Sequence, residues 1–187
     1  MKRNTREHII ATAASLFQAR GINSTGVDTI AAEADISKMT LYKYFHTKED
    51  LVLEIISLRS REFYDWLSDR LSKHSDDPAE KLQKLIDCID EWLQNPECAG
   101  LPFMKASAEF PQSDNPVNLL SAELAKEFRT YLTKLAADAG AKSPESLGQQ
   151  LSMLIEGAIL SEQLNKGSGA LGYAREAAIL LIKSSLR

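Results

Sequence analysis

The sequence predicts an all-α protein of about nine helices. Three observations predict this class. Apolar residues recur every three to four positions through most of the 187 residues, which is the period of an amphipathic helix. Glycine, proline and helix-capping residues fall between these periodic segments. No segment alternates apolar and polar residues in the way that a half-buried strand does.

Capping residues mark four helices in the first third of the chain. Asn, Thr and Ser side chains accept hydrogen bonds from the first N–H groups of a helix, and an acidic residue three positions later can return the bond. The predicted caps and helices are Asn4 with Glu7 before a helix that ends at Gly21, Thr25 with Asp28 before Val27 to about Ala34, Ser37 before Lys38 to about Phe45, and Thr47 with Asp50 before a long helix to about Leu71.

Proline and glycine mark five further helices. Proline suits the first position of a helix, and glycine suits the residue that follows its end. The predicted segments run from Asp77-Pro78 to near Asn95-Pro96, from Leu101 to Phe110, from Asn115-Pro116 to Gly140, from Ser143-Pro144 onward, and from the Gly167-Ser168-Gly169 turn to the C-terminus.

Composition excludes several classes of protein. Hydrophobic residues make up 44% and charged residues 26% of the chain, which excludes disordered and fibrous proteins. No apolar run approaches the roughly 18 residues of a membrane span, and the N-terminus lacks the pattern of a signal peptide. Two cysteines are too few for a disulfide scaffold and fit a reducing compartment. We therefore expect a cytoplasmic protein.

Charge is distributed unevenly along the chain. The net charge is −4, yet residues 1–48 hold seven basic and four acidic residues, whereas residues 49–187 hold fifteen and twenty-two. A basic N-terminal segment on an acidic body is typical of a protein in which only the first part contacts nucleic acid.

Residues 27–45 have the spacing of a helix-turn-helix motif, with Lys38–Phe45 as its recognition helix. Ala31 and Ala34 are small enough for the two helices to cross closely. Lysines and hydroxyls suit phosphates and base edges, and a methionine suits a thymine methyl group. The alternative interpretation is a helical bundle with a solvated polar face. The residues left to face outward are Lys38, Met39, Thr40, Tyr42, Lys43 and Tyr44.

Residues 5–51 contain a series of short motifs at fixed spacings: Leu16-Phe17, Gly21-Ile22, Thr25-Gly26-Val27 with Ile30-Ala31, Ile36-Ser37 with Thr40-Leu41-Tyr42, Tyr44-Phe45, and Lys48-Glu49 with Leu51. Through these motifs the segment resembles the DNA-binding domain of the TetR/AcrR regulators. The two departures are Gly26, where that family usually has Ser or Thr, and Asp35, where its turn usually has Gly. Aspartate tolerates a left-handed backbone better than most residues, so the turn is expected to form.

The resemblance implies a homodimer that places one recognition helix in each half of a pseudo-palindromic operator. It also implies a DNA-binding domain at residues 1–47 and a ligand-binding and dimerisation domain at residues 48–187. Asp28 could accept a hydrogen bond from a cytosine amino group or cap its own helix. Tyr42 could be a partly buried residue that packs between helices instead of a DNA contact. The implied phosphate contacts are Thr40, Tyr42, Tyr44, Lys48 and the backbone N–H of Gly26. The residues expected closest to the bases are Lys38, Met39 and Lys43, and Thr29 is expected near the edge of the DNA.

The body is expected to bind a small molecule. Aromatic side chains and methionine suit an apolar, adaptable pocket, although ordinary core packing is the favoured interpretation of any single one of them. Glu156 interrupts an apolar stretch, so it either contacts the ligand or is exposed to solvent beside the dimer interface. Glu109 is similarly ambiguous and could cap or orient a neighbouring segment. The candidates are Phe63, Trp66, Leu67, Cys88, Trp92, Phe103, Met104, Phe110, Phe128, Tyr131, Met153 and Glu156.

The last two helices are expected to form the dimer, paired with their symmetry mates in a four-helix interface. Packing within one chain is the alternative. The candidate residues are Leu147, Leu151, Leu154, Ala158, Ala174, Ala177, Ala178 and Leu181.

The two cysteines allow the alternative of a redox sensor, because oxidation of Cys88 or Cys98 could reshape the body. However, no cluster of Lys, Arg or His residues lies near either cysteine in the sequence to lower its thiol pKa. The three histidines share no metal-ligand spacing, so neither a metal nor another cofactor is expected.

These observations together predict a regulator, most favourably a homodimeric repressor that a small-molecule effector releases from its operator. One alternative is a helix-turn-helix regulator whose body binds a protein partner. Another is an all-α enzyme that uses Glu109 or Glu156. The chain lacks a nucleophile–base pair, a phosphate-binding glycine loop and a metal set, so an enzyme is not expected.

Overall fold

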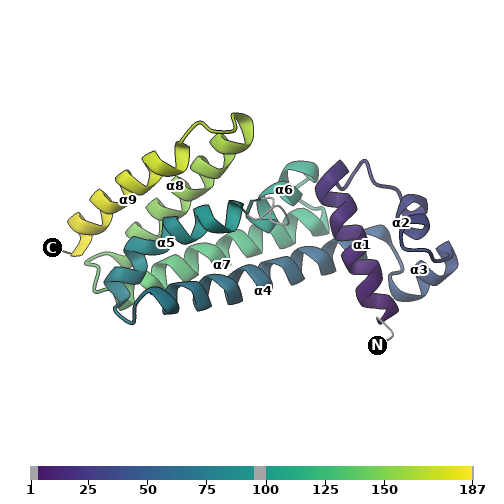
Figure 1. The fold of residues 1–187 in the computed structure, drawn as a ribbon, viewed down its shortest axis with the longest axis horizontal. Coiled ribbons are helices and arrows are strands. Elements are labelled where there is room, and N and C mark those ends of the chain that lie inside the picture. Colours follow the sequence, from purple (N-terminus) through teal and green to yellow (C-terminus); the bar gives the residue numbers. More distant parts are fainter. Residues whose placement is uncertain (1–3, 95–99, 187) are drawn as a thin grey trace. The chain divides into compact units, whose positions relative to one another are not determined.

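The computed structural model describes residues 4–94 and 100–186, and within them nine α-helices and no strand are found (Figure 1). The predicted fold class is therefore confirmed, and each helix begins or ends within a few residues of its predicted bounds. The helices are α1 (Thr5–Arg20), α2 (Val27–Glu33), α3 (Lys38–Tyr44), α4 (Lys48–His74), α5 (Pro78–Gln94), α6 (Pro102–Glu109), α7 (Pro116–Asp138), α8 (Pro144–Leu164) and α9 (Ala170–Leu186).

Three of the predicted helix caps form. Ser37 Oγ accepts a hydrogen bond from Thr40 N at 3.1 Å at the start of α3. Thr47 and Asp50 exchange bonds of 3.0 and 2.9 Å between side chain and backbone at the start of α4. The side chain of Asn4 caps α1 in the same way. These bonds satisfy N–H groups that have no partner inside the helix.

The predicted cap of α2 is wrong. Gly26 occupies the cap position, and no side chain accepts from the first turn of this helix. Thr25 is buried, and its hydroxyl donates instead to the carbonyl of Gly21 at 2.7 Å. Asp28 forms an ion pair with Lys38 of α3. Both side chains therefore have partners that the local capping pattern does not reveal.

The helices form two compact units. The first contains residues up to Glu62 together with Pro102–Ala122, and so holds α1, α2, α3, the first part of α4, α6 and the start of α7. Fully buried side chains of this unit include Ile9 and Ala13 of α1, Ile30 of α2, Leu41 of α3 and Leu51 of α4.

The turn between α2 and α3 depends on Asp35. Its φ is +52°, and among the described residues it is the non-glycine residue with a positive φ. This left-handed conformation is the one expected for Asp35, because a short polar side chain tolerates it better than a branched one.

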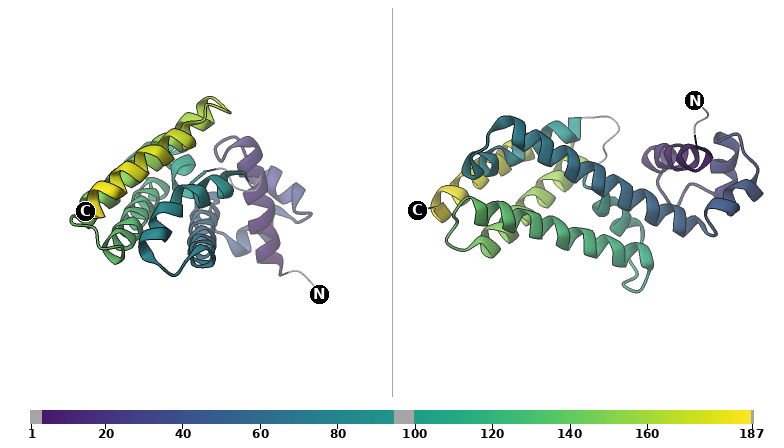
Figure 2. Two further views of the ribbon diagram at one scale, coloured as in Figure 1. Left: turned by 60° about the vertical axis from the view of Figure 1, so that its left-hand side comes forward. Right: turned by 90° about the horizontal axis from the view of Figure 1, so that it is seen from below.

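The second unit contains the described residues of Phe63–Leu101 and those from Glu123 onward. Here α9 packs on both α5 and α8, and Figures 1 and 2 show α8 and α9 side by side. Gly148 of α8 lies against Thr133 of α7, so close that a Cβ at Gly148 would be 2.8 Å from Thr133 N. The predicted functional boundary between residues 47 and 48 stays a prediction.

None of the described helices combines the length and the apolar character that crossing a bilayer requires.

Candidate nucleic-acid interface

The short helix α3 presents a polar and aromatic face to solvent. It buries Leu41 completely, and Phe45 directly after it is also buried. Met39 is 72% exposed, and the two tyrosines of this helix are about half as exposed. The remaining predicted contacts, Lys38 and Lys43, are exposed, whereas Thr40 is half-buried and bonded to Ser37 Oγ at 2.8 Å. The structure thus brings all six predicted α3 residues together on one short helix.

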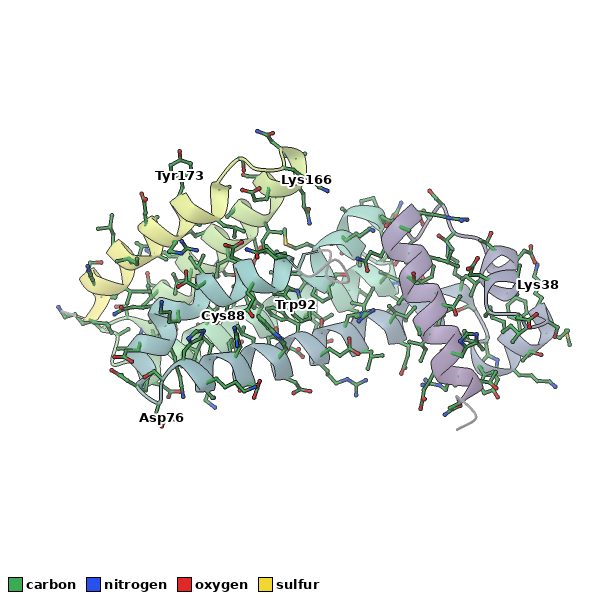
Figure 3. The ribbon with its side chains drawn as sticks, in the orientation of Figure 1. Lys38, Asp76, Cys88, Trp92, Lys166 and Tyr173 are labelled. Atoms are coloured by element: carbon green, nitrogen blue, oxygen red, sulfur yellow. The ribbon has the colours of Figure 1, made fainter. Side chains whose placement is uncertain are left out.

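Asp28 of α2 and Lys38 of α3 form an exposed ion pair on this face. Lys38 Nζ lies 2.8 Å from Oδ1 and 3.1 Å from Oδ2 of Asp28. The hydrogen bond to Asp28 raises the pKa of Lys38, so the ammonium stays charged. Lys38 is labelled in Figure 3, beside α2 and α3. Asp28 is therefore a candidate interface residue that belongs with the α3 residues.

Gly26 and Thr29 lie at the start of α2. Gly26 is exposed, and a Cβ there would have no neighbour within 4 Å. Its φ of −80° is open to any residue, so nothing in the local structure requires glycine. Thr29 is half-buried.

Lys48, predicted to contact phosphate, has a partner inside the chain. Its ammonium donates to the carbonyl of Ile22 at 2.6 Å, and the residue is half-buried. Burial lowers the pKa of Lys48, and the nearby carboxylate of Glu109 acts in the opposite direction. The lysine thus joins the start of α4 to the connection between α1 and α2.

Helix α6 contacts the last turn of α1 through Lys105, and the connection that follows it through the backbone of Glu109. Lys105 Nζ donates to the carbonyls of Phe17 and Gln18, in the last turn of α1, at 2.9 and 3.1 Å. A cation there complements the unpaired carbonyls at a helix C-terminus. Asn23 Nδ2 donates to the carbonyl of Glu109 at 2.7 Å. Sequence reasoning missed Lys105, because its partners lie far away in sequence.

In the second unit, aromatic side chains from α4, α5 and α7 form one cluster. Phe63 lies 5.2 Å from Trp92 and 6.1 Å from Phe128 between ring centroids, and Trp66 lies 5.2 Å from Trp92. Tyr131 joins through Tyr64, at 5.7 Å. Burial raises the pKa of Tyr131. Sequence reasoning missed Tyr64, and the structure gathers the other five candidates.

Five further predicted ligand residues come from other elements, and Leu67 is fully buried on α4. Phe103 and Met104 of α6, with Phe110 directly after it, belong to the first unit. Met153 is 56% exposed on α8. Glu156 accepts a hydrogen bond from Ser152 one turn earlier on the same helix. The structure therefore groups only part of the predicted set, and the ligand-binding role of each residue remains a prediction.

Cys88 is buried in α5, and burial raises its thiol pKa to about 11. A protonated thiol is a poor nucleophile, so this environment does not favour the alternative of a redox sensor at Cys88. Cys98 lies outside the described residues. Among those residues, no group of three or more His, Cys, Asp and Glu side chains could hold a metal ion.

Most of the predicted dimer residues are buried within their own chain. Leu147, Leu151, Ala158, Ala174 and Ala178 are at most 7% exposed, whereas Leu154, Ala177 and Leu181 are half-buried. A different set of apolar side chains on the same two helices faces solvent, and we call it the α8–α9 stripe. It consists of Met153, Leu160 and Leu164 on α8 and Tyr173 and Leu180 on α9.

The fold and this interface define a helix-turn-helix DNA-binding protein with a helical body. Residues 9–55 match the model of the bacterial regulatory proteins of the tetR family. The regulator YxaF of Bacillus subtilis, itself uncharacterized, is 26% identical over 184 residues, or 96% of each chain. The repressor KstR2 of Mycolicibacterium smegmatis is 36% identical over 80 residues, which are 43% of this chain and 37% of that protein.

Among solved structures, SCO4454, a TetR-family regulator from Streptomyces coelicolor, superposes with a TM-score of 0.89 at 25% identity and covers 98% of this chain and 96% of its own. The comparisons support a TetR-family transcriptional regulator with a helix-turn-helix DNA-binding domain. These relatives and this solved structure are transcriptional regulators, which supports a DNA-binding regulator over an enzyme.

Proposed function

We propose that this chain is a homodimeric repressor that acts in the cytoplasm, binds a pseudo-palindromic operator and is released by a small-molecule effector. The observation that carries the DNA-binding part is the exposed face of α3, where lysine, hydroxyl and aromatic side chains gather on a rigid two-turn helix. A dimer on such a site would compete with other proteins for the same stretch of DNA, which is the simplest form of repression.

The α8–α9 stripe supports the homodimer. Its five members are each between 49% and 81% exposed, and exposed apolar patches of this kind mark association surfaces. Figure 3 labels Tyr173, which points away from the neighbouring helices of its unit. Gly157, also exposed on α8, has no neighbour within 4 Å of a Cβ and would let a second helix approach closely. The proposal thus places the dimer contact on the stripe and its half-buried neighbours Leu154, Ala177 and Leu181.

Two features support coupling between an effector and the DNA-binding helices. Helix α4 is continuous from Lys48, which contacts the α1–α2 connection, to the turns that carry Phe63 and Trp66. Helix α6 contacts the end of α1 through Lys105. An effector that favours another position of α4 or α6 would shift the dimer to a state with lower affinity for DNA, and DNA would lower the affinity for effector by the same factor.

A mobility-shift titration tests the DNA-binding part of the proposal. The full-length protein is titrated against DNA from immediately upstream of its own gene and against a scrambled duplex, at two salt concentrations. We expect selective, salt-sensitive binding to the upstream DNA. In this proposal Lys43 makes one phosphate contact in each half-site. Replacing Lys43 with Ala should therefore make the slope of log affinity against log salt shallower by about 1.8, because each of the two lost contacts contributes about 0.9.

The matched control is Lys166→Ala, which removes the same charge from the exposed α8–α9 connection; Lys166 is labelled in Figure 3. We expect its salt slope to equal that of the unmodified protein. Equal slopes for both variants would contradict the α3 interface. Native mass spectrometry of the same preparation reports dimer mass and any bound effector, and a monomer without effector that binds both duplexes equally would contradict the proposal as a whole.

A further inference from the structure

We propose that Asp28 and Lys38 act as one base-reading pair that selects a guanine and a cytosine, on the same or adjacent base pairs, in each operator half-site. This inference rests on the proposed function, because it assigns a sequence preference to the same DNA-binding face. It makes Asp28 a specificity-determining residue.

The two side chains of the pair contact each other and both remain accessible to solvent. Lys38 Nζ contacts both carboxylate oxygens of Asp28, at 2.8 and 3.1 Å, so the position of the ammonium is set by two acceptors from a neighbouring helix. Nevertheless 48% of the Lys38 side chain and 79% of the Asp28 side chain remain exposed. Each group therefore keeps hydrogen-bonding capacity for a ligand that approaches from solvent.

Phosphate is a poor ligand for this pair. A phosphate that approached Lys38 would also approach the Asp28 carboxylate a few ångströms away, and repulsion between the two anions would offset the attraction to the lysine. Lys43 on the same helix is exposed and shows no such carboxylate partner among the ion pairs of the described residues. The two lysines of α3 thus differ in what they can bind.

The major-groove edge of a G·C pair fits the Asp28–Lys38 pair. Guanine presents two adjacent acceptors, O6 and N7, which lysine favours, and cytosine presents an amino donor, which aspartate favours. A donor next to an acceptor on the protein thus meets acceptors next to a donor on the DNA. The Asp28 carboxylate also weakens binding to DNA of other sequence. Where no cytosine amino group is present to donate to it, the carboxylate is repelled by the DNA phosphates without compensation.

Selection from a randomised double-stranded DNA library tests the inference. Full-length protein is incubated with the library, bound DNA is recovered and sequenced, and the procedure is repeated for Asp28→Asn and for Lys38→Gln. We expect the unmodified protein to recover a symmetric motif that contains G and C at one position or two adjacent positions of each half-site. Each variant should lose about tenfold in preference there and retain the rest of the motif.

Glu33→Gln is the matched control, because it removes the same charge from an exposed residue at the end of the same helix. It should retain the complete motif. A second measurement is the affinity for random duplex DNA, which should rise more for Asp28→Asn than for Glu33→Gln. All three side chains are exposed, and equal thermal midpoints would show that the variants are folded.

The outcomes separate the inference from the proposed function. A motif that both Asp28→Asn and Lys38→Gln leave unchanged, or that they change at unrelated positions, would overturn the base-reading pair while the regulator remains a DNA-binding protein. A library from which the unmodified protein recovers no motif would overturn both.

Discussion

The carboxylate of Glu109 is bound to the backbone of Ile22, with Oε1 3.0 Å from Ile22 N, and its other oxygen lies 2.8 Å from Asn23 N. A residue of α6 thus satisfies two consecutive N–H groups in the connection between α1 and α2. The sequence leaves open whether Glu109 caps or orients a neighbouring segment. The structure shows that it binds the backbone of a segment that is near in space but far away in the chain.

Replacing Glu109 with Gln should lower the free energy of unfolding by about 1–2 kcal/mol, because a neutral amide forms weaker bonds than a carboxylate and turns an N–H₂ group toward an N–H donor. Urea denaturation followed by circular dichroism measures this change. Glu123→Gln, at an exposed position of α7, should change stability by less than about 0.5 kcal/mol. Equal losses in the two variants would show that the backbone contacts of Glu109 contribute nothing measurable.

Alanine at two glycines of α8 should have opposite effects. A Cβ at Gly148 would lie 2.8 Å from the backbone nitrogen of Thr133, and relieving such overlap typically costs about 1–3 kcal/mol. Gly157 is exposed with open space around it, so alanine should stabilise the isolated helix by about 0.5–1 kcal/mol. Thermal unfolding measures both effects, in a Leu160→Glu background in which the proposed dimer contact beside Gly157 is removed. Destabilisation by Gly157→Ala alone in that background would contradict this packing of α8.

Leu160→Glu should convert a dimer to a monomer, because it places a charge within the α8–α9 stripe. Light scattering coupled to gel filtration measures the mass. Leu119→Glu is the matched control: this leucine of α7 is 56% exposed, close to the 49% of Leu160, but lies outside the stripe. We expect the control to keep its mass. If Leu160→Glu remained a dimer, the association surface would have to lie elsewhere.

The Cys88 thiol should react slowly with iodoacetamide at neutral pH in the folded protein, tested in a Cys98→Ser background. The folded-state pKa is about 11 against an ordinary value of 9.0, so the reactive thiolate should accumulate as the pH approaches 11. The raised pKa also has a consequence for stability: the contribution of the protonated thiol is complete below pH 9 and is lost as pH rises from 9 toward 11. Rapid alkylation at neutral pH, as in the urea-unfolded control, would refute this environment.

Much of the fold follows from local chemistry that a sequence displays directly. Ser37, Thr47 and Asp50 form their caps because each bond joins residues within four positions of one another. Asp35 adopts its left-handed conformation for an equally local reason. By contrast, the cap assigned to Thr25 and Asp28 does not form: Thr25 donates to the carbonyl of Gly21, and Asp28 pairs with a lysine ten positions later. Local sequence patterns do not reveal partners of this second kind.

The body was harder to predict, because apolar residues surround α8 on more than one side. Leu151 is fully buried whereas Leu160 is half exposed, yet both are leucines in the same apolar stretch. Periodicity shows that apolar residues cover more than one face of α8. It does not show which of these faces packs inside the chain and which faces solvent. The structure separates them, and the residues predicted for the dimer fall mostly on the inner one.

The bonds of Lys105 and Glu109 to α1 and its following residues also bear on the order in which the chain acquires its structure during synthesis. The residues that these bonds join are 86 to 88 positions apart in sequence. A ribosome exposes α1, α2 and α3 long before α6, so the N–H groups of Ile22 and Asn23 lack their Glu109 partner in the nascent chain. The DNA-binding helices therefore complete their contacts only after α6 has emerged, which delays a fully assembled DNA-binding surface until the greater part of the protein has been made.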